Sequence, residues 1–379
     1  MTAAGLIFSN IHDKCIPEMT ARRAMASIPF GGRYRLIDFT LSNMVNSGIN
    51  KVGIVTHNNY RSLIDHIGTG KDWDLARRSG GVMILPPFIT AYDNPRANQL
   101  YTTRLEALMG VTEYISHCQE DLIVLSDSDV VCNIDLSEVL EQHERTGADL
   151  TVVTKKMTLC GGDKESLGKV IVNTNADGVV DEFVEYTQLM CGEYDVSTNI
   201  MVFTRTFLMS LIDNAIAHGY TEFYRQALPF AMANSKFCTY NYEGYYAAVS
   251  SLPHYFATSM ELLSDETRAE LFAVKDRPVY TKVRNTPPTR YAEGAEVKNS
   301  LIADGCVIEG TVENSILFRG VHVKKGTTVK NSIMLQNSCT GENVTLNCVI
   351  ADKNVVIRDD RVLSGSEVLP YYIAKGKMI

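Results

Sequence analysis

The feature that most constrains the fold of this chain is a repeat in its last part. Four similar phrases begin at Asn299, Asn314, Asn331 and Asn347, at spacings of 15, 17 and 16 residues. Within these phrases apolar residues recur at every sixth position: Ile302 and Ile308; Leu317, Val323, Val329 and Leu335; Val344, Ile350 and Val356. A period of six fits neither an α-helix nor a flat strand, whose side chains repeat after about 3.6 and 2 residues.

Such a period is typical of a prism with three flat faces, in which each face holds one hexapeptide and every sixth side chain points inward. Glycines that suit tight corners stand between the hexapeptides: Gly305, Gly310, Gly320, Gly326 and Gly341. We therefore predict a left-handed parallel β-helix over residues 288–379. An ordinary meander of short strands is the alternative, and it leaves the period unexplained.

Residues 1–252 differ from the repeats, because short apolar runs alternate there with amphipathic segments. The runs read as buried strands: Ala3–Phe8, Val52–Thr56, Leu122–Ser126 and Asp149–Thr154. A helix is predicted over Leu136–Arg145, with Asp135 as its N-cap. Strands alternating with helices indicate an α/β domain with a mostly parallel sheet, whose ligands bind beyond the carboxyl ends of the strands.

A connector joins the two parts. Apolar residues at helical spacing after residue 253 predict a helix, and the pair Pro287-Pro288 cannot continue one, so an extended linker should follow. We therefore expect a connecting helix and linker over residues 253–287. A chain of 379 residues is long enough for two domains.

Composition excludes several classes of protein. With 45% hydrophobic and 21% charged residues, the chain is neither disordered nor fibrous. A net charge of −8 argues against wide contact with nucleic acid or an anionic membrane, and no apolar run approaches the ~20 residues of a membrane span. The N-terminus lacks the basic segment of a signal peptide. Nine cysteines scattered singly indicate reduced thiols, so we expect a cytoplasmic protein.

The segment Pro29–Ile49, PFGGRYRLIDFTLSNMVNSGI, resembles the signature of the sugar-nucleotide pyrophosphorylases, in particular the ADP-glucose pyrophosphorylase (glucose-1-phosphate adenylyltransferase) family. Further matching phrases are VVDEFVE at 179–185, STNIMVF at 197–203 and YEGYY at 242–246. The resemblance covers nearly the whole chain. It implies a Rossmann-like, GT-A-like nucleotidyltransferase domain joined to a hexapeptide β-helix.

In this family a sugar phosphate attacks the α-phosphorus of ATP, and pyrophosphate leaves. Two polyanions must be aligned, so catalysis depends on a glycine-rich loop, basic side chains and Mg²⁺ held by carboxylates. This chain departs from that pattern at its phosphate loop, which reads NIHDKCI at 10–16, without the glycines and with Cys15 at the arginine position. Three further replacements are Met25 for a catalytic lysine, Tyr186 for a sugar-phosphate lysine and Ala248 for the second metal carboxylate.

Other positions keep the family's pattern. The resemblance identifies Asp129 as the first metal-binding aspartate, and Glu185 and Ser197 as sugar-contacting residues, which together form the remnant of a metal and sugar site. No complete metal site is predicted. The basic residues Arg22 and Arg23, with Arg35, match positions that look toward the β-helix domain, where anionic effectors of the family bind. A retained effector site is therefore implied at three positions: Arg22, Arg23 and Arg35.

Losing one preorganised charged group typically costs about 10²–10³ in rate, so the replacements predict little or no turnover by this chain alone. The resemblance points to the non-catalytic, GlgD-type regulatory subunits, which assemble with an active subunit into a heterotetramer for bacterial glycogen synthesis. Such a chain requires no cofactor of its own, whereas its catalytic partner needs Mg²⁺. Stacked β-helices and open strand edges also predict self-association.

Two alternatives stay open. In the first, the chain is an active nucleotidyltransferase whose basic residues rebuild a phosphate site: Lys14, Arg22, Arg23 and Arg104. In the second, it is a sugar-phosphate or effector sensor that needs no partner. The eight histidines form no metal-binding motif along the sequence, and His322, the one histidine in the repeats, favours a structural role over that of an acyltransferase base.

Overall fold

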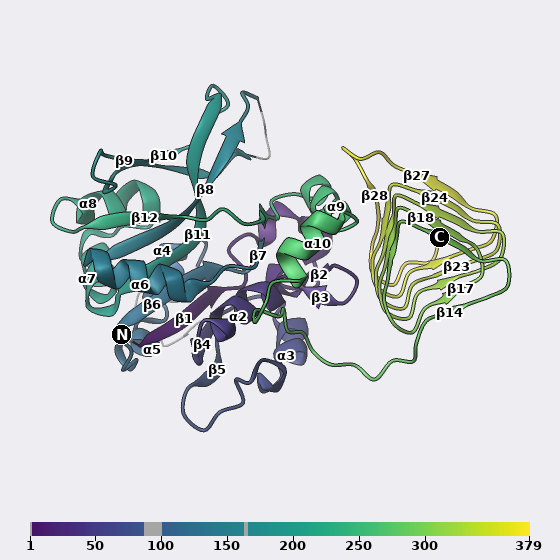
Figure 1. The fold of residues 1–379 in the computed structure, drawn as a ribbon, viewed down its shortest axis with the longest axis horizontal. Coiled ribbons are helices and arrows are strands. Elements are labelled where there is room, and N and C mark those ends of the chain that lie inside the picture. The colour runs from purple at the N-terminus through teal and green to yellow at the C-terminus, as the bar shows by residue number, and fades with distance from the viewer. Residues whose placement is uncertain (1, 87–100, 163–165) are drawn as a thin grey trace.

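The computed structural model of the chain describes residues 2–86, 101–162 and 166–379. It contains an N-terminal α/β unit and a C-terminal β-helix, which lie side by side along the longest axis of the molecule (Figure 1). The expected fold class is confirmed for both units, and the connector between them contains two helices rather than one. These are α9 (Leu252–Glu261) and α10 (Asp265–Phe272), which lie on the side of the α/β unit that faces the β-helix (Figure 1).

Among the described residues, a nine-stranded sheet forms the centre of the α/β unit, in the order β10-β9-β11-β6-β1-β4-β5, with β8 pairing β11 and β12 pairing β8. The strands are β1 Ala3–Phe8, β4 Lys51–Val55, β5 Gly81–Leu85, β6 Leu122–Asp127, β8 Leu150–Leu159, β9 Val170–Thr174, β10 Val180–Glu185, β11 Gly192–Thr204 and β12 Phe237–Asn241. β1 pairs in parallel with β4 and β6, and β4 with β5. β11 runs antiparallel to β6, β8 and β9, whereas β12 pairs in parallel with β8.

Helices cover both faces of this sheet. One apolar cluster joins inward residues of α2, α3 and α6 to Ile7 of β1, and another joins α4, α5 and α7 to Leu6 and Phe8. The side chain of Asp135 accepts a hydrogen bond from the backbone N–H of Ser137, so it caps α6 as predicted. The helices of this unit are α1 Pro17–Thr20, α2 Leu36–Asn46, α3 Arg61–Ile67, α4 Arg104–Met109, α5 Thr112–Ser116, α6 Leu136–Thr146, α7 Arg205–His218 and α8 Leu228–Met232.

Two small antiparallel pairs complete the α/β unit. β2 pairs with β3, and β7 pairs with β13 beside the carboxyl end of β6. Their bounds are β2 Pro29–Phe30, β3 Tyr34–Arg35, β7 Val130–Cys132 and β13 Tyr246–Ala248. No helix in the described part of the chain is long and apolar enough to cross a membrane.

Three parallel sheets of five short strands build the β-helix. The first contains β14 Arg290–Tyr291, β17 Val307–Ile308, β20 His322–Val323, β23 Cys339–Thr340 and β26 Val356–Ile357. The second contains β15 Glu296–Lys298, β18 Thr311–Glu313, β21 Thr328–Lys330, β24 Thr345–Asn347 and β27 Val362–Ser364. The third contains β16 Leu301–Ile302, β19 Ile316–Leu317, β22 Ile333–Met334, β25 Val349–Ala351 and β28 Tyr371–Ile373.

The six-residue pattern places most of its members inside this prism. Leu317, Val323 and Val329 are fully buried in its core, whereas Leu335 and Ile350 belong to the apolar cluster that the prism shares with the α/β unit. Val356 differs, because its neighbours Val355 and Ile357 take the buried positions there and Val356 is half-buried. The asparagines that open the repeated phrases turn the corners: Asn299, Asn314 and Asn331 adopt positive φ angles of 43°, 46° and 43°.

The two units pack through a shared apolar cluster. Met25 and Phe30 from the α/β unit and Tyr255 from α9 belong to the same cluster as Phe318 and Leu335 of the β-helix. A buried ion pair adds to this contact, because Arg23 Nη2 donates to both carboxylate oxygens of Asp352, at 2.7 and 2.5 Å. The pair fixes the β-helix against the segment that precedes β2.

Candidate functional site

The loop that follows β1 is held by side chains rather than by an open row of backbone amides. Asn10 Oδ1 accepts hydrogen bonds from Ser9 Oγ at 2.6 Å, Thr56 Oγ1 at 2.8 Å and the backbone N–H of His57 at 3.1 Å. Asn10 Nδ2 donates to Asp13 Oδ2 at 2.7 Å, and Asp13 Oδ1 accepts from the backbone N–H of Met25 at 2.7 Å. Burial raises the pKa of Asp13 to about 6. The loop therefore presents a carboxyl group where a phosphate-binding loop presents amides.

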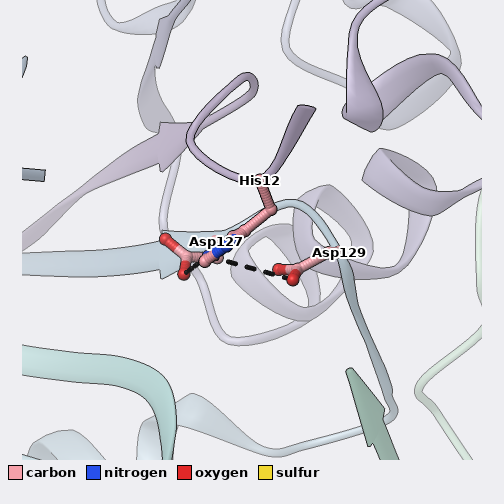
Figure 2. A group of neighbouring side chains, drawn as sticks. All are labelled: His12, Asp127 and Asp129. Carbon is pink, nitrogen blue, oxygen red and sulfur yellow. Dashed lines mark hydrogen bonds and ion pairs between the residues drawn. The ribbon is translucent and has the colours of Figure 1, made fainter. Parts of the chain in front are cut away.

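Four charged side chains meet where this loop approaches the carboxyl end of β6, and Figure 2 shows three of them, His12, Asp127 and Asp129. His12 Nε2 lies 2.9 Å from Asp127 Oδ2 and 3.9 Å from Asp129 Oδ2. Arg104, the first residue of α4, donates from Nη2 to Asp127 Oδ2 at 2.5 Å and from Nε to Asp127 Oδ1 at 3.4 Å. Asp127 is thus shared by two basic groups. The parallel pairing of β1 with β6 aligns Phe8 with Asp127 and so brings the loop and the two aspartates together.

The charges of this group shape one another. Burial opposes ionisation of Asp127, but the Arg104 guanidinium and His12 outweigh it and lower the pKa of the carboxyl. Burial raises the pKa of Asp129. Burial also favours neutral His12, but the carboxylates of Asp129 and Asp127 outweigh this effect and raise the pKa of the imidazole well above its ordinary value. With His12 protonated, the two basic and two acidic groups balance.

Aromatic rings extend the site from Arg104 toward Ser197. The Arg104 guanidinium carbon lies 5.8–5.9 Å from the ring centroids of Phe8, Phe223 and Tyr224. The hydroxyl of Tyr224 lies 3.1 Å from Ser197 Oγ and donates to Asn199 Oδ1 at 3.0 Å. Ser197 is thereby connected to the charged group through Tyr224. Glu185 is not, because its carboxylate pairs with the exposed side chain of Arg225.

Three of the four replaced family positions have structural roles, and the fourth, Cys15, lies at the surface. Met25 is 1% exposed and packs in the apolar cluster between the units. Tyr186 is buried, and its hydroxyl donates to the carbonyl oxygen of Cys160 at 2.5 Å. Ala248 pairs with Val130 in the β7-β13 ladder, directly beside Asp129. Cys15 is exposed, and its side chain interacts with His12.

The donors of this group supply only part of the Mg²⁺ site that the family resemblance implies for the active members. Magnesium favours six oxygen ligands in an octahedron, commonly with several waters and a ligand phosphate. Here position 248, beside Asp129, supplies a methyl group instead of a carboxylate, and the third side chain within reach is the imidazole of His12. Asp127 and Asp129 remain as two carboxylates within reach of each other, so the structure keeps part of that site without the carboxylate at position 248.

Basic residues gather at a second place, between the two units. Arg23 pairs with Asp352, Arg35 donates from Nη1 to the carbonyl oxygen of Ser62 at 2.6 Å, and burial lowers the pKa of Arg35 to about 10. Lys353 joins them from the β-helix: burial, followed by the charges of Arg35 and Arg23, lowers its pKa to about 6. Arg22 is exposed. Of the three arginines expected at an effector site, Arg23 and Arg35 are close to Lys353.

Sequence reasoning missed His12, Asp127 and Lys353. For the first two a signal existed, since both follow strands that were predicted to be buried, and carboxyl ends of neighbouring parallel strands lie together. The sequence, however, does not show that the two strands that precede these residues are neighbours in the sheet. Lys353 carried no signal, because its neighbours come from the other unit.

Comparison with known proteins agrees with this architecture. Residues 16–245 match the family model described as nucleotidyl transferase, and residues 287–367 match the one described as GlmU-like, C-terminal hexapeptide. The chain is 36% identical to the glycogen biosynthesis protein GlgD of Bacillus subtilis (strain 168), over 98% of this chain and 95% of the relative. It is 34% identical to the glucose-1-phosphate adenylyltransferase of Bacillus thuringiensis (strain Al Hakam), over 91% of this chain and 90% of that protein.

The glucose-1-phosphate adenylyltransferase of Bacillus anthracis is 33% identical to the chain, again over 91% of this chain and 90% of the relative. These matches span both units, so they reflect the whole architecture rather than one shared domain. The chain therefore belongs to the nucleotidyl transferase family, in the group that includes the glucose-1-phosphate adenylyltransferases and GlgD.

Proposed function

We propose that the chain is a regulatory, catalytically deficient subunit of a heterotetrameric glucose-1-phosphate adenylyltransferase, acting in bacterial glycogen synthesis in the cytoplasm. Its partner would be a catalytic subunit that converts ATP and glucose 1-phosphate to ADP-glucose and pyrophosphate with Mg²⁺. The observation that supports the proposal most strongly is how side chains fill and hold the loop after β1. Asp13 and the amide of Asn10 occupy its interior, and its neighbour Met25 is built into the apolar contact with the β-helix.

The requirements for binding a nucleotide triphosphate explain why this arrangement argues against catalytic turnover. A nucleotide triphosphate needs close-approach amides and basic groups that are free to face it. Arg104 and Arg23, two of the residues that would rebuild such a site, are committed to the buried carboxylates of Asp127 and Asp352. Releasing either one would leave an uncompensated buried charge, which is strongly unfavourable.

We further propose that the basic residues between the units form an anionic effector site. Arg23, Arg35 and Lys353 bring three basic groups together near the carboxylate of Asp352, with Asp38 and Asp65 also acting on Arg35, and Arg23 Nη1 is buried without a hydrogen-bond partner among the described residues. A phosphorylated ligand would accept the hydrogen bond that Arg23 Nη1 lacks and would favour protonation of Lys353. Because the site joins the two units, its occupancy would bias their packing and, through subunit contacts, the conformation of a partner.

The decisive experiment is co-expression with a catalytic glucose-1-phosphate adenylyltransferase from the same organism. We expect the two chains to copurify as a four-chain assembly, and the rate or effector response of the catalytic chain to change. The purified chain alone, given ATP, glucose 1-phosphate and Mg²⁺, should release no pyrophosphate above background. Turnover by the chain alone at rates typical of its relatives would instead establish an active enzyme. Effector binding without any association would establish a sensor.

A matched pair of variants tests the effector site within that assembly. Arg35→Met should abolish the response to a phosphorylated effector and leave copurification intact. Arg22→Met, a change at an exposed neighbour in the same segment, should leave both unchanged. An unchanged response in Arg35→Met would refute this location.

A further inference from the structure

The ends of β8 and β11 bring two exposed cysteines to the same position of one antiparallel ladder. The last pair of that ladder joins Leu159 to Gly192, and continuing its register by one residue sets Cys160 opposite Cys191. Both are free and exposed thiols. We propose that Cys160 and Cys191 form a reversible disulfide bond, which makes the end of this ladder a site of thiol oxidation. This inference does not depend on the proposed subunit role, because it concerns neither turnover nor a partner.

The two chain segments are held together on both sides of the cysteines. On one side lies the ladder itself, which ends with the pair Leu159 and Gly192. On the other side the backbone N–H of Gly162 donates to the carbonyl oxygen of Gln188 at 3.0 Å. Because contacts on both sides fix the separation of the segments, the two cysteines between them stay opposite each other.

The backbone contacts of the cysteines identify the closer of the two kinds of antiparallel pair. No backbone hydrogen bond joins Cys160 to Cys191, both of which lie within the described part of the chain. Their carbonyl oxygens instead accept hydrogen bonds from tyrosine hydroxyls, that of Cys160 from Tyr186 at 2.5 Å and that of Cys191 from Tyr194 at 3.4 Å. In a non-hydrogen-bonded pair the Cα atoms lie about 4.5 Å apart and the two side chains share one face of the sheet.

This separation is compatible with a disulfide, which spans Cα–Cα distances of about 4.4–6.8 Å. Rotation of the two exposed side chains would therefore bring the Sγ atoms together without a shift of the strands. The third exposed cysteine of the chain, Cys15, belongs to the loop after β1, where its side chain interacts with His12. Of the exposed thiols, only Cys160 and Cys191 are thus placed as a pair.

Oxidised glutathione serves as the oxidant for this pair. The thiolate of one cysteine attacks a sulfur of oxidised glutathione, whose S–S bond breaks and releases one glutathione. The thiolate of the second cysteine then attacks the cysteine sulfur of the mixed disulfide, forms the bond between Cys160 and Cys191, and releases the second glutathione. Each cysteine proton ends on a released glutathione, so two protein thiols are oxidised and one small disulfide is reduced.

The bond would fix the ladder beside a small apolar cluster. Leu159 and Tyr186 belong to this cluster, and Met190 and Tyr194 pack against it. Local opening of the ladder end, which lets backbone amides exchange with solvent, would become rarer when the two strands are linked. Slower hydrogen exchange at residues 186–191 is therefore the expected mark of the oxidised chain.

The test uses the full chain with Cys15→Ser, so that the third exposed thiol does not react. The chain is fully reduced and then incubated with excess oxidised glutathione. Intact-mass spectrometry should show the loss of two hydrogens with no glutathione retained, peptide mapping should link residue 160 to residue 191, and dithiothreitol should restore both thiols. A lasting glutathione adduct on either cysteine, or a bond from either one to another cysteine, would overturn the proposal.

Single substitutions in the same background distinguish a pair from two independent thiols. With Cys160→Ser, Cys191 should keep one glutathione, because no second thiol can displace it, and Cys191→Ser should trap glutathione on Cys160 in the same way. Cys339→Ser, at a half-buried cysteine of the β-helix, is the matched control and should leave the linkage unchanged. Release of glutathione in Cys160→Ser would show that another thiol resolves the adduct and would refute the pairing.

Hydrogen exchange then measures whether the bond crosses the ladder. Oxidation should slow exchange at residues 186–191 by about tenfold in the chain that retains both cysteines, and should not slow it in either single variant. Circular dichroism would verify that each variant folds. Exchange that oxidation leaves unchanged in the chain with both cysteines would contradict a bond at this position.

Discussion

Single residues in the α/β unit show how buried charges constrain one another. Asp127 is fully buried, and its carboxylate is held by Arg104 and His12. Removing one partner of a buried pair leaves an uncompensated charge, whereas replacing both partners by neutral groups of similar shape is far less harmful. Substitutions of Arg104 alone and of Arg104 together with Asp127 can therefore test how strongly these two charges depend on each other.

Arg104→Met should lower the free energy of unfolding by about 3 kcal/mol, because the Asp127 carboxylate loses its principal partner. Urea denaturation followed by circular dichroism would measure this loss. Adding Asp127→Asn in the same chain should recover part of it, because the neutral amide needs no guanidinium. A double variant less stable than Arg104→Met by the full cost of a second independent loss would contradict the coupling.

A second residue-scale prediction concerns Lys353. Burial lowers its pKa from 10.5 to about 6, so between these values the unfolded chain binds a proton that the folded chain does not. The contribution of this lysine to stability therefore rises with pH across that window and is most unfavourable below about pH 6. Lys353→Met should raise the melting temperature more at pH 5.5 than at pH 9, by roughly several degrees at the lower pH.

Thermal melting at the two pH values measures this difference, with Lys375→Met as the control. Lys375 is exposed, so its replacement should change stability little at either pH. Equal stabilisation by Lys353→Met at pH 5.5 and pH 9 would show that the lysine does not lose its proton on folding.

Whether a residue of the site could be predicted from the sequence depended on whether its interaction partners lie close to it along the chain. The family resemblance singled out Asp129 and Ser197, and the structure connects Asp129 to the charged group through His12 and Ser197 to Arg104 through Tyr224. His12 could not be assigned to this group, because its partners lie 115 or more residues away, on a strand whose place in the sheet was unknown. For Asp127 and His12, neighbouring charges outweigh burial and favour the charged forms.

At the scale of elements, the corners of the β-helix explain why asparagine opens the first three repeated phrases, whereas in the fourth the positive φ, 52°, falls on Cys348 after Asn347. Asn331 adopts a φ of 43°, and its amide donates to Asn347 Oδ1 at 2.9 Å. Residues with a Cβ lose roughly 1–2 kcal/mol in the left-handed region, and asparagine tolerates it because its side chain hydrogen-bonds locally. Asparagine therefore has two functions in such a corner: its backbone adopts the positive φ, and its side-chain amide forms a hydrogen bond.

Asn331→Ala should therefore destabilise the β-helix by about 1–2 kcal/mol, since alanine keeps the backbone strain and loses the amide contact. Asn331→Gly should cost less, because glycine adopts this conformation freely. Denaturant unfolding of the two variants beside the parent would separate these effects. A glycine variant as unstable as the alanine one would mean that the amide contact, and not the backbone, dominates.

Elements were predictable where a period defines them. The six-residue period identified the β-helix because its inward positions need apolar side chains, and Val323 and Val329 are fully buried there. Whether neighbouring strands of the main sheet run parallel or antiparallel was harder to predict from the sequence. An apolar run such as that of β11 has the same composition whether it pairs parallel or antiparallel, and β11 proves antiparallel to β6. The asparagine corners were also missed, since they follow from backbone geometry rather than from burial.

At the scale of the whole molecule, the two units are coupled by apolar packing and by the Arg23–Asp352 pair. Tyr372 strengthens the pair, because its hydroxyl lies 2.7 Å from Asp352 Oδ2 and 2.9 Å from the carbonyl oxygen of Glu18, and its one hydrogen can be donated to either. This contact joins residues from both units and from both ends of the chain. We therefore expect the two units to unfold together.

Arg23→Met should uncouple the units, because it leaves the Asp352 carboxylate buried at their junction. Differential scanning calorimetry should then show two separate transitions where the parent shows one, with a loss of about 3 kcal/mol at the junction. Arg22→Met, at the exposed neighbouring position, should melt like the parent. A single transition at the parental temperature in Arg23→Met would exclude this coupling.

The same junction has a consequence for how the chain is made. Arg23 and Asp352 are separated by 329 residues. At ribosomal rates of about 5–20 residues per second, roughly 15–65 s pass between the synthesis of one and of the other. For that interval the nascent α/β unit exposes Met25 and Phe30, side chains that are later covered at the junction. Newly made chains are thus most vulnerable to aggregation while they are still tethered, and slowing translation ahead of residue 288 would prolong that exposure.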